Sequence, residues 1–228
     1  MAITKLSNLD TLRNYLTRDW PRKITEVVLH HTWAPTAAQY RGQATWDGIR
    51  RYHMDVRNWS DIGYHLGVGP DGSMWRLRDM GRSGAHVLNR NAHSVGVAMV
   101  GNFDVEDPAL NGLATAAQVV RAVCDRFALP ASAVRFHREF QDKTCPGTQL
   151  NLAEFRRLVF GSVIVPGEQP RPKLTSTVDG VRLDLGAWVD DKQGISYGPL
   201  RAVVTALGGT ITYDGTANQI RIERARLP

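Results

Sequence analysis

Two short apolar runs place the strongest constraint on the fold. Glu26–His31 (EVVLHH) and Ser94–Val100 (SVGVAMV) consist mostly of β-branched and other apolar residues. Apolar runs of this length that lack strict alternation are typical of strands buried on both faces, whereas a strand with one solvated face alternates apolar with polar side chains. A sheet whose central strands are buried needs helices to cover it. The two runs therefore predict two buried strands of a sheet.

The rest of the first 160 residues supplies the other elements of such a fold. Apolar residues recur at helical spacing between about Thr45 and Val56, which predicts a helix there. The turn Gly-Pro-Asp-Gly separates two runs and predicts a hairpin. The runs that flank this turn are Ile62–Val68 and Ser73–Arg78; the later elements are helices over Thr115–Phe127 and Asn151–Phe160, with Asn151 as N-cap, and a short strand over Ala133–His137. This order predicts an α/β fold, a mixed central sheet flanked by helices.

The composition changes after Phe160. The segment Gly161–Ser176 contains three prolines and shows no periodicity, which is typical of a linker. Two strand-like segments and one helix-like segment follow it, namely Val178–Leu185, Gly209–Ile222 and Gly198–Leu207. We therefore expect a first domain over residues 1–160, a linker over 161–175 and a second small α+β domain over 176–228.

Charge and hydropathy restrict the partners. The formal net charge of +6 favours an anionic partner, such as nucleic acid or a cell wall that carries carboxylates and phosphates. The basic residues are scattered, and no nucleic-acid motif with interleaved aromatic residues occurs, so we expect no nucleic-acid partner. No run of about 18 apolar residues predicts a membrane span. The sequence carries no prediction of oligomeric state.

The first residues (MAITKLSNLDTLRNYL) contain no uninterrupted apolar stretch of the kind found in secretory signals. We therefore expect a protein made in the cytoplasm without a signal peptide. If its target lies outside the cytoplasm, it acts there after release.

Three parts of the chain carry residues that suit a zinc site. His30 and His31 end the first buried strand, His137 ends another predicted strand, and Cys145 follows eight positions later in HREFQDKTCPG. Two imidazoles and one thiolate with a fourth position open form a known catalytic zinc arrangement. The residues alone leave open whether His30 or His31 is the ligand. The second cysteine, Cys124, lies among apolar residues of a predicted helix and is expected to be a buried thiol.

Four segments together resemble the zinc amidases of the phage-lysozyme and peptidoglycan-recognition-protein type. These segments are VVLHHTW, DIGYHLGVGPDGSMW, GAHVLNRNAHSVGVAMVGNF and FHREFQDKTCPG, in that order, within residues 24 to 160. The resemblance implies a Zn²⁺ cofactor held by His30, His137 and Cys145. It also implies hydrolysis of the amide bond between N-acetylmuramic acid and L-alanine in peptidoglycan.

The same resemblance implies roles for three more residues. Tyr64, in the Gly-Tyr-His segment, and Lys143, two positions before the cysteine, correspond to catalytic positions of the family. Both suit the stabilisation of a tetrahedral oxyanion, which needs donors or positive charge where the negative charge develops. His86, in Gly-Ala-His, resembles a position that lines the substrate groove. Taken alone, Tyr64 would be a packed strand residue and Lys143 a solvated loop charge.

Relatives of this fold that recycle wall fragments in the cytosol usually have an aspartate as third zinc ligand and a glutamate on a central strand. This chain has Cys145, and SVGVAMVG contains no carboxylate. These differences favour the wall-degrading branch and a phage or prophage endolysin. The alternatives are a non-catalytic peptidoglycan-binding protein, which the presence of Cys145 disfavours, and a recycling amidase that acts on soluble muropeptides.

The remaining histidines and tryptophans are expected to serve the structure. His53 falls on the apolar face of a predicted helix, and His65 and His93 are interpreted as structural. Trp33 and Trp59 are expected in the aromatic core, although either residue would suit the floor of a glycan groove.

The C-terminal segment resembles a small domain named after the N-terminal region of copper amine oxidases, through Tyr-Gly-Pro-Leu-Arg, Leu-Gly-Gly and Ile-Arg-Ile. Gly198 stands where that domain usually has valine. Such domains often accompany wall-acting enzymes, so the resemblance implies binding to the cell surface. No histidine follows His137, so we expect no copper chemistry.

Overall fold

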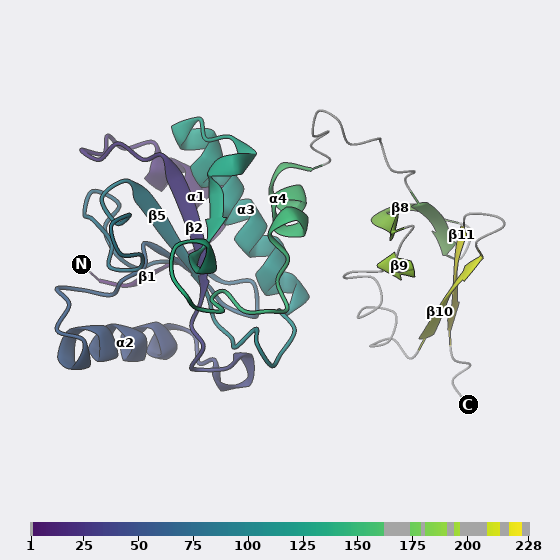
Figure 1. Ribbon diagram of the computed structural model, residues 1–228, viewed down its shortest axis with the longest axis horizontal. Helices are drawn as coiled ribbons and strands as arrows, with labels where there is room; N and C mark the ends of the chain where they lie inside the picture. Colours follow the sequence, from purple (N-terminus) through teal and green to yellow (C-terminus); the bar gives the residue numbers. More distant parts are fainter. Residues whose placement is uncertain are drawn as a thin grey trace. The chain divides into compact units, whose positions relative to one another are not determined.

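The computed structural model describes residues 2–161 in full and, beyond them, the backbone of five strands between residues 174 and 224. The chain divides into two compact units, Met1–Val163 and Ile164–Pro228 (Figure 1). The first unit contains every residue proposed above for the zinc site.

A six-stranded mixed sheet forms the centre of the first unit. Its strand order is β1-β4-β3-β5-β2-β6. The strands are β1 (Thr4–Leu6), β2 (Glu26–His31), β3 (Leu66–Val68), β4 (Met74–Arg76), β5 (Ser94–Met99) and β6 (Val134–Phe136). Strands β3, β5, β2 and β6 run parallel to one another, while β4 is antiparallel to both β3 and β1. The prediction of a mixed α/β sheet flanked by helices is confirmed.

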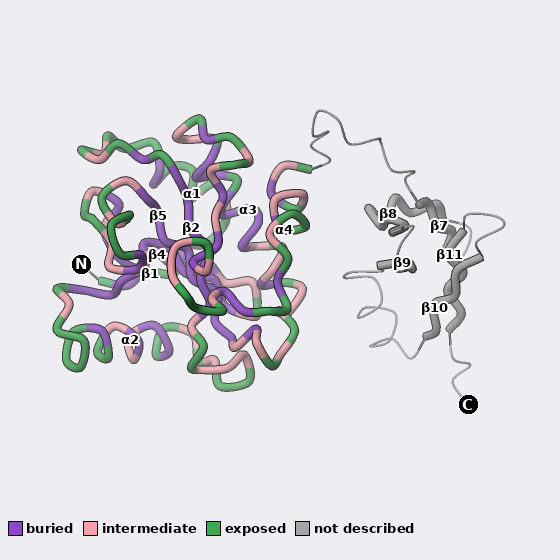
Figure 2. The backbone as a smooth tube through the Cα atoms, in the orientation of Figure 1, coloured by how far each residue is buried: buried purple, intermediate pink, exposed green. Residues whose placement is uncertain are grey.

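Helices cover the sheet and bury its central strands. The helices are α1 (Leu9–Leu16), α2 (Gln43–Arg51), α3 (Leu110–Phe127) and α4 (Leu152–Phe160). Helix α3 contacts α1, α4 and the central strands, whereas α2 runs along another side of the sheet (Figure 1). Every residue of β2 and β5 is buried, as the continuous purple of these strands shows (Figure 2).

Alternate residues of the central strands contribute to two separate cores. In β5, Val95 and Val97 belong to the larger core with α1, α3 and α4, whereas Ala98 belongs to the smaller core with Trp46 and Ile49 of α2. This follows from strand geometry, because successive side chains point to opposite faces of a sheet. The face that carries the smaller core is the one on which the candidate site is built.

The elements differ from the sequence expectations mainly at their ends. Strand β2 has the predicted bounds, and the Asn151 side chain caps α4 by accepting a hydrogen bond from the Glu154 N–H at 3.1 Å, as expected. Both hairpin strands are shorter than predicted, and α3 begins at Leu110 rather than Thr115. Helix α2 continues as a π-helical turn, η2 (Tyr52–Val56), within the predicted helical range. Strand β1 and helix α1 were not predicted.

The described strands of the second unit form two antiparallel groups. These strands are β7 (Leu174–Val178), β8 (Val181–Asp190), β9 (Gly194–Ser196), β10 (Gly209–Asp214) and β11 (Gln219–Arg224). Strand β8 pairs with β7 and β9, and β10 pairs with β11. The range predicted as one strand, Gly209–Ile222, thus holds parts of two, and β7 takes in the end of the predicted linker. The predicted helix Gly198–Leu207 lies outside the described residues.

No helix among the described residues combines the length and apolar character needed to cross a membrane.

Candidate metal centre

Two parallel strands and the loop after them bring three metal-binding side chains together. His30 lies on β2, and His137 directly follows β6 as the first residue of the 3-10 turn η4 (His137–Glu139). Because β2 and β6 are parallel neighbours, their carboxyl ends lie at the same edge of the sheet. The chain then returns, and Cys145 approaches both histidines. One potential ligand atom from each of the three residues lies within 4.8 Å of the other two.

The alternation of side chains along β2 separates the two candidate histidines. His30 faces the cysteine, with its Nδ1 atom 3.6 Å from the Cys145 Sγ atom. His31 faces the larger core, where its Nδ1 atom accepts a hydrogen bond from the Phe103 N–H at 3.1 Å. The geometry therefore places His30, and not His31, beside His137 and Cys145.

The second nitrogen of each clustered histidine already has a partner. The His30 Nε2 atom lies 3.0 Å from the His86 Nδ1 atom, and the His137 Nε2 atom hydrogen-bonds the Gln141 side-chain oxygen. A metal-ligating histidine characteristically donates its other ring N–H to a nearby acceptor, which fixes the tautomer and the ring orientation. The Gln141 oxygen can only accept, so His137 donates from Nε2 and keeps a lone pair on Nδ1. These residues fit a metal ion of the kind that binds two imidazoles and a thiolate.

Burial controls the protonation of the cluster. It lowers the pKa of His30 and of His137, so both rings are neutral near pH 7, the form that binds metals. Burial also raises the pKa of the Cys145 thiol to about 12. This thiol ionises near neutral pH only if a cation binds beside it and compensates the buried negative charge. The three side chains thus form a neutral, desolvated set suited to receive a cation.

Polar contacts hold the loop that carries Cys145. The Arg138 N–H donates to the Cys145 carbonyl at 2.8 Å, and the Arg138 guanidinium donates to the carbonyls of Gly147 and Leu150 at 2.7 and 2.6 Å. From the other side, the Asp104 carboxylate accepts hydrogen bonds from the Thr144 hydroxyl at 2.7 Å and from the Thr148 N–H at 3.0 Å. Sequence analysis identified neither Arg138 nor Asp104.

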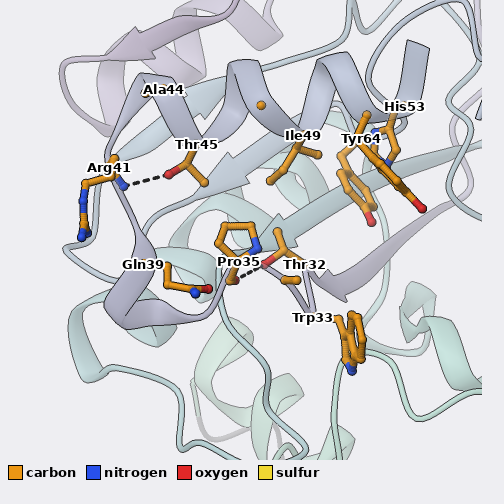
Figure 3. A pocket seen from close by; sticks show the side chains of 13 residues that line it. Thr32, Trp33, Pro35, Gln39, Arg41, Ala44, Thr45, Ile49, His53 and Tyr64 are labelled. Atoms are coloured by element: carbon orange, nitrogen blue, oxygen red, sulfur yellow. Dashed lines mark hydrogen bonds between the residues drawn. The ribbon is translucent and has the colours of Figure 1, made fainter. Parts of the chain in front are cut away.

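A cavity of about 700 Å³ has Tyr64 in its lining, although His30, His137 and Cys145 do not line it. It lies between α2 and the segment that follows β2, and Tyr64 and His53 stand together at one end of it (Figure 3). The cavity is lined by Thr32, Trp33, Ala34, Pro35, Gln39, Arg41, Ala44, Thr45, Gly48, Ile49, Tyr52, His53 and Tyr64. The Tyr64 ring also contacts His30, with 5.1 Å between the ring centroids. Tyr64 therefore lies between the cavity and the cluster of His30, His137 and Cys145.

The two expected catalytic residues lie in contrasting surroundings. Burial raises the pKa of the Tyr64 hydroxyl, with a smaller contribution from Cys145, so the hydroxyl keeps its proton and remains a donor. Lys143 is exposed on the Cys145 loop. Its positive charge is near enough to contribute to the lowered pKa values of His30 and His137.

His86, expected at the substrate groove, lies behind His30 as seen from Cys145. It is buried, with 7% of its surface exposed, and it is absent from the cavity lining. Its ring contacts both His30 and His65. The substrate-binding role of His86 stays a prediction.

The structure also tests the expectations for three other aromatic residues and for Cys124. His65 is structural, as predicted, because its Nδ1 atom accepts from the Gly96 N–H and its Nε2 atom donates to the Arg82 carbonyl at 3.0 Å. The placement of Trp33 in the core is wrong, because 63% of its surface is exposed and it lines the cavity. His53 is buried and accepts from the Gly63 N–H, as a core histidine would, yet it also lines the cavity. Cys124 is a buried thiol, as predicted.

Comparisons with known proteins agree with this geometry. A family model described as N-acetylmuramoyl-L-alanine amidase matches residues 20–148, more than half of the chain. The human protein named N-acetylmuramoyl-L-alanine amidase is 35% identical over 129 residues, which cover 54% of this chain and 22% of the human protein.

Solved structures of similar fold were also found. Wild-type Drosophila PGRP-LB superposes with a TM-score of 0.54 at 28% identity, covering 60% of this chain and 82% of that one. The endolysin N-acetylmuramoyl-L-alanine amidase LysCS of Clostridium intestinale superposes with a TM-score of 0.51 at 25% identity, covering 61% and 89% of the two chains.

Proposed function

The chain belongs to the N-acetylmuramoyl-L-alanine amidase family, and on this basis we propose that it is a zinc-dependent hydrolase of peptidoglycan. The bond cleaved is the amide between N-acetylmuramic acid and the L-alanine of the stem peptide. One observation carries the proposal: the potential ligand atoms of His30, His137 and Cys145 converge beside a cavity large enough for a substrate segment.

His30, His137 and Cys145 would hold the zinc ion and leave a fourth position open. Zinc in such a site supplies a hydroxide nucleophile near neutral pH and polarises the scissile carbonyl. The protein orients this chemistry through its own contacts, because Gln141 fixes His137 and the Arg138 hydrogen bonds fix the loop of Cys145.

Tyr64 and Lys143 would stabilise the oxyanion that forms when the amide carbonyl is attacked. The Tyr64 hydroxyl keeps its proton because burial raises its pKa, so it can donate a hydrogen bond to the developing negative charge. Lys143 would contribute a positive charge from the loop that also carries Cys145. The departing amide nitrogen needs a proton, and the Tyr64 hydroxyl, which lines the cavity, would share that role through water.

We propose that peptidoglycan occupies the cavity along α2. The exposed indole of Trp33, which lines this cavity, offers a surface on which a sugar ring can stack. Polar side chains such as Gln39 and Arg41 also line the cavity. The similarity to PGRP-LB and to an endolysin amidase supports this class of substrate.

Digestion of purified cell walls tests the proposal. Mass spectrometry should show intact stem peptides with a new L-alanine amine, while the glycan chains gain no reducing ends. Chelation should abolish the reaction and added zinc should restore it, and Cys145→Ala should lose both metal and activity. Full activity of metal-free protein would overturn the zinc assignment.

The same assay separates the alternatives. A peptidoglycan-binding protein without catalysis would sediment with walls and release no peptide. A recycling amidase would cleave soluble muropeptides and leave intact walls uncut.

The proposal extends to a phage or prophage endolysin that is made in the cytoplasm and reaches the wall after release. Similarity to the endolysin of Clostridium intestinale supports this finer assignment. Expression in a bacterium with a susceptible wall tests it: lysis should require a second protein that permeabilises the inner membrane. Lysis by the chain alone would contradict it.

A further inference from the structure

The His86 ring occupies a space that two glycines keep open. A Cβ atom added to Gly96 of β5 would lie 2.7 Å from the His86 Cδ2 and Cγ atoms, and one added to Gly84 would lie 2.5 Å from the Cδ2 atom. The backbone of the loop is held as well, because the Asn91 side-chain oxygen accepts from the His86 and Val87 N–H groups at 2.8 and 3.0 Å. The ring is thus fixed between the sheet and its own loop.

A chain of hydrogen bonds runs from His86 to a backbone carbonyl. The Ser94 hydroxyl donates to the Arg90 carbonyl at 2.8 Å, and the Ser94 Oγ atom lies 3.3 Å from the His86 Nε2 atom. A serine hydroxyl has one proton. Because that proton points to a carbonyl, which can only accept, Ser94 is left to accept from His86. His86 therefore carries a proton on Nε2.

The direction of the next hydrogen bond follows from this one. Among residues 2–161 the hydrogen-bond partners of the His30 and His86 rings are each other, Cys145 and Ser94, and none of these is a carboxylate, so neither buried ring gains from a second proton. With its one proton on Nε2, His86 offers a lone pair on Nδ1, which lies 3.0 Å from the His30 Nε2 atom. His30 must donate from Nε2, and its Nδ1 atom keeps a lone pair that faces the Cys145 thiol and accepts from it in the metal-free protein.

We propose that Ser94 and His86 are positioning residues that fix the tautomer of His30. The series of hydrogen bonds from His30 through His86 and Ser94 ends at the Arg90 carbonyl. It leaves the His30 Nδ1 lone pair facing the metal position before any metal binds. The inference rests on the proposed zinc site, and it assigns to His86 a role that differs from contact with the substrate.

The alternative is that His86 only fills space between Gly84 and Gly96. Packing and tautomer control make different predictions, because packing depends on the volume of the side chain whereas tautomer control depends on one acceptor atom. The two are distinguished by the metal-free protein and by substitutions of matched shape.

The first test reads the tautomers in the metal-free full-length chain by long-range ¹H–¹⁵N correlation NMR of the histidine rings. The expected result is a neutral ring with its proton on Nε2 for both His30 and His86. A proton on the His30 Nδ1 atom would overturn the proposal. This measurement uses neither substrate nor metal, so its failure is distinguishable from failure of the proposed amidase function.

The second test compares His86→Asn with His86→Leu in the full-length chain. The two side chains have nearly the same shape, but only asparagine places an acceptor oxygen near the former Nδ1 position. Zinc affinity, measured by competition with a chromophoric chelator, should fall about 10–100-fold in the leucine variant, as for other partners of metal-ligating histidines. It should be largely retained in the asparagine variant.

Ser94→Ala extends this test along the chain. Loss of the hydroxyl frees the His86 Nε2 proton to move to Nδ1, so the NMR spectrum should show a mixture of His30 tautomers and the zinc affinity should fall. Equal zinc affinities of the leucine and asparagine variants, whether both high or both low, would leave packing as the explanation and would overturn tautomer control.

Discussion

The Tyr64 hydroxyl is the feature of the candidate site that a single-atom change can test. The ring packs against His30 and lines the cavity, so Tyr64→Phe keeps the packing and removes only the donor. We expect turnover on wall fragments to fall about 10²–10³-fold, the usual cost of losing one oxyanion donor, with zinc content unchanged. Tyr52→Phe is the matched control, because Tyr52 lines the same cavity but is half exposed. A normal rate for Tyr64→Phe would remove this hydroxyl from the mechanism.

Asp104 offers a test of the loop that carries Cys145. Partial burial opposes its ionisation, but hydrogen bonds from Thr144 and Thr148 outweigh this and lower the pKa of the carboxyl below its usual value of 3.8. The ionised carboxylate therefore stabilises the loop at all pH values above 3.8. This contribution is lost as the pH falls through the lowered pKa of the folded state.

We expect Asp104→Ala to reduce zinc affinity by about tenfold, because the substitution frees the loop that carries one ligand. The difference from the parent chain should be present at pH 7, as measured by chelator competition. Asp107→Ala, an exposed change in the same segment, should leave the affinity unchanged. Equal zinc affinities of the Asp104 variant and the parent would show that the hydrogen bonds of Asp104 with Thr144 and Thr148 do not act on the metal site.

The residues of the candidate site were predictable to different degrees. His30, His137 and Cys145 could be proposed from residue chemistry and family resemblance, and the structure brings all three together. Residue chemistry alone did not separate His30 from His31. The structure does, because the two side chains point to opposite faces of the sheet and only His30 faces Cys145. Ser94 and Asp104 left no sequence signal, because their partners lie elsewhere in the chain and ordinary serines and aspartates of loops and strand ends look the same.

At the scale of elements, burial decided which predictions held. Strand β2 was predicted to the residue because its apolar run is buried on both faces. Strand β1 was missed because the edge position leaves Thr4 and Lys5 exposed, so no apolar run marks it. Helix α1 has eight residues and buries only three of them. Gly63 pairs with the backbone of Ala85 in a loop, which shortens the predicted hairpin strand.

Helix α3 ends in a conformation that its sequence does not favour. Its C-cap, Ala128, has φ 52° and ψ 44°, the left-handed region in which a Cβ atom is unfavourable. Ala128 is exposed, so Ala128→Gly should stabilise the first unit by about 1 kcal/mol. Thermal or urea unfolding measures the change.

Ala114→Gly provides a control of opposite sign in the same helix. Ala114 is also exposed but lies inside α3, where glycine should destabilise by about 1 kcal/mol. Destabilisation by both substitutions would contradict the account of the helix end.

At the scale of the whole molecule, the inferred catalytic residues all lie in the unit Met1–Val163. A chain that ends at Val163 should fold, bind zinc and cleave soluble muropeptides at a rate close to that of the full chain. If the second unit binds walls, the shortened chain should bind intact walls less well, because a second binding unit raises the effective concentration of the enzyme at the surface. Sedimentation with purified walls and a muropeptide assay measure the two properties.

The unit Ile164–Pro228 should sediment with walls on its own if it anchors the enzyme. If that unit stays in the supernatant while the shortened enzyme binds walls as the full chain does, wall anchoring by the second unit is wrong.

The cysteine and the first histidine of the cluster are separated by 115 positions along the chain, and this distance has a consequence for synthesis. A nascent chain cannot assemble the metal centre until Cys145 has left the ribosome and the parallel pairing of β2 with β6 has formed. In the proposed zinc enzyme, metal binding would therefore follow formation of the sheet, and zinc would not nucleate folding from the N-terminus. Under the proposed function, a ribosome that stalls before Cys145 would release a polypeptide without hydrolytic activity, and only a chain translated beyond Cys145 could cleave a wall.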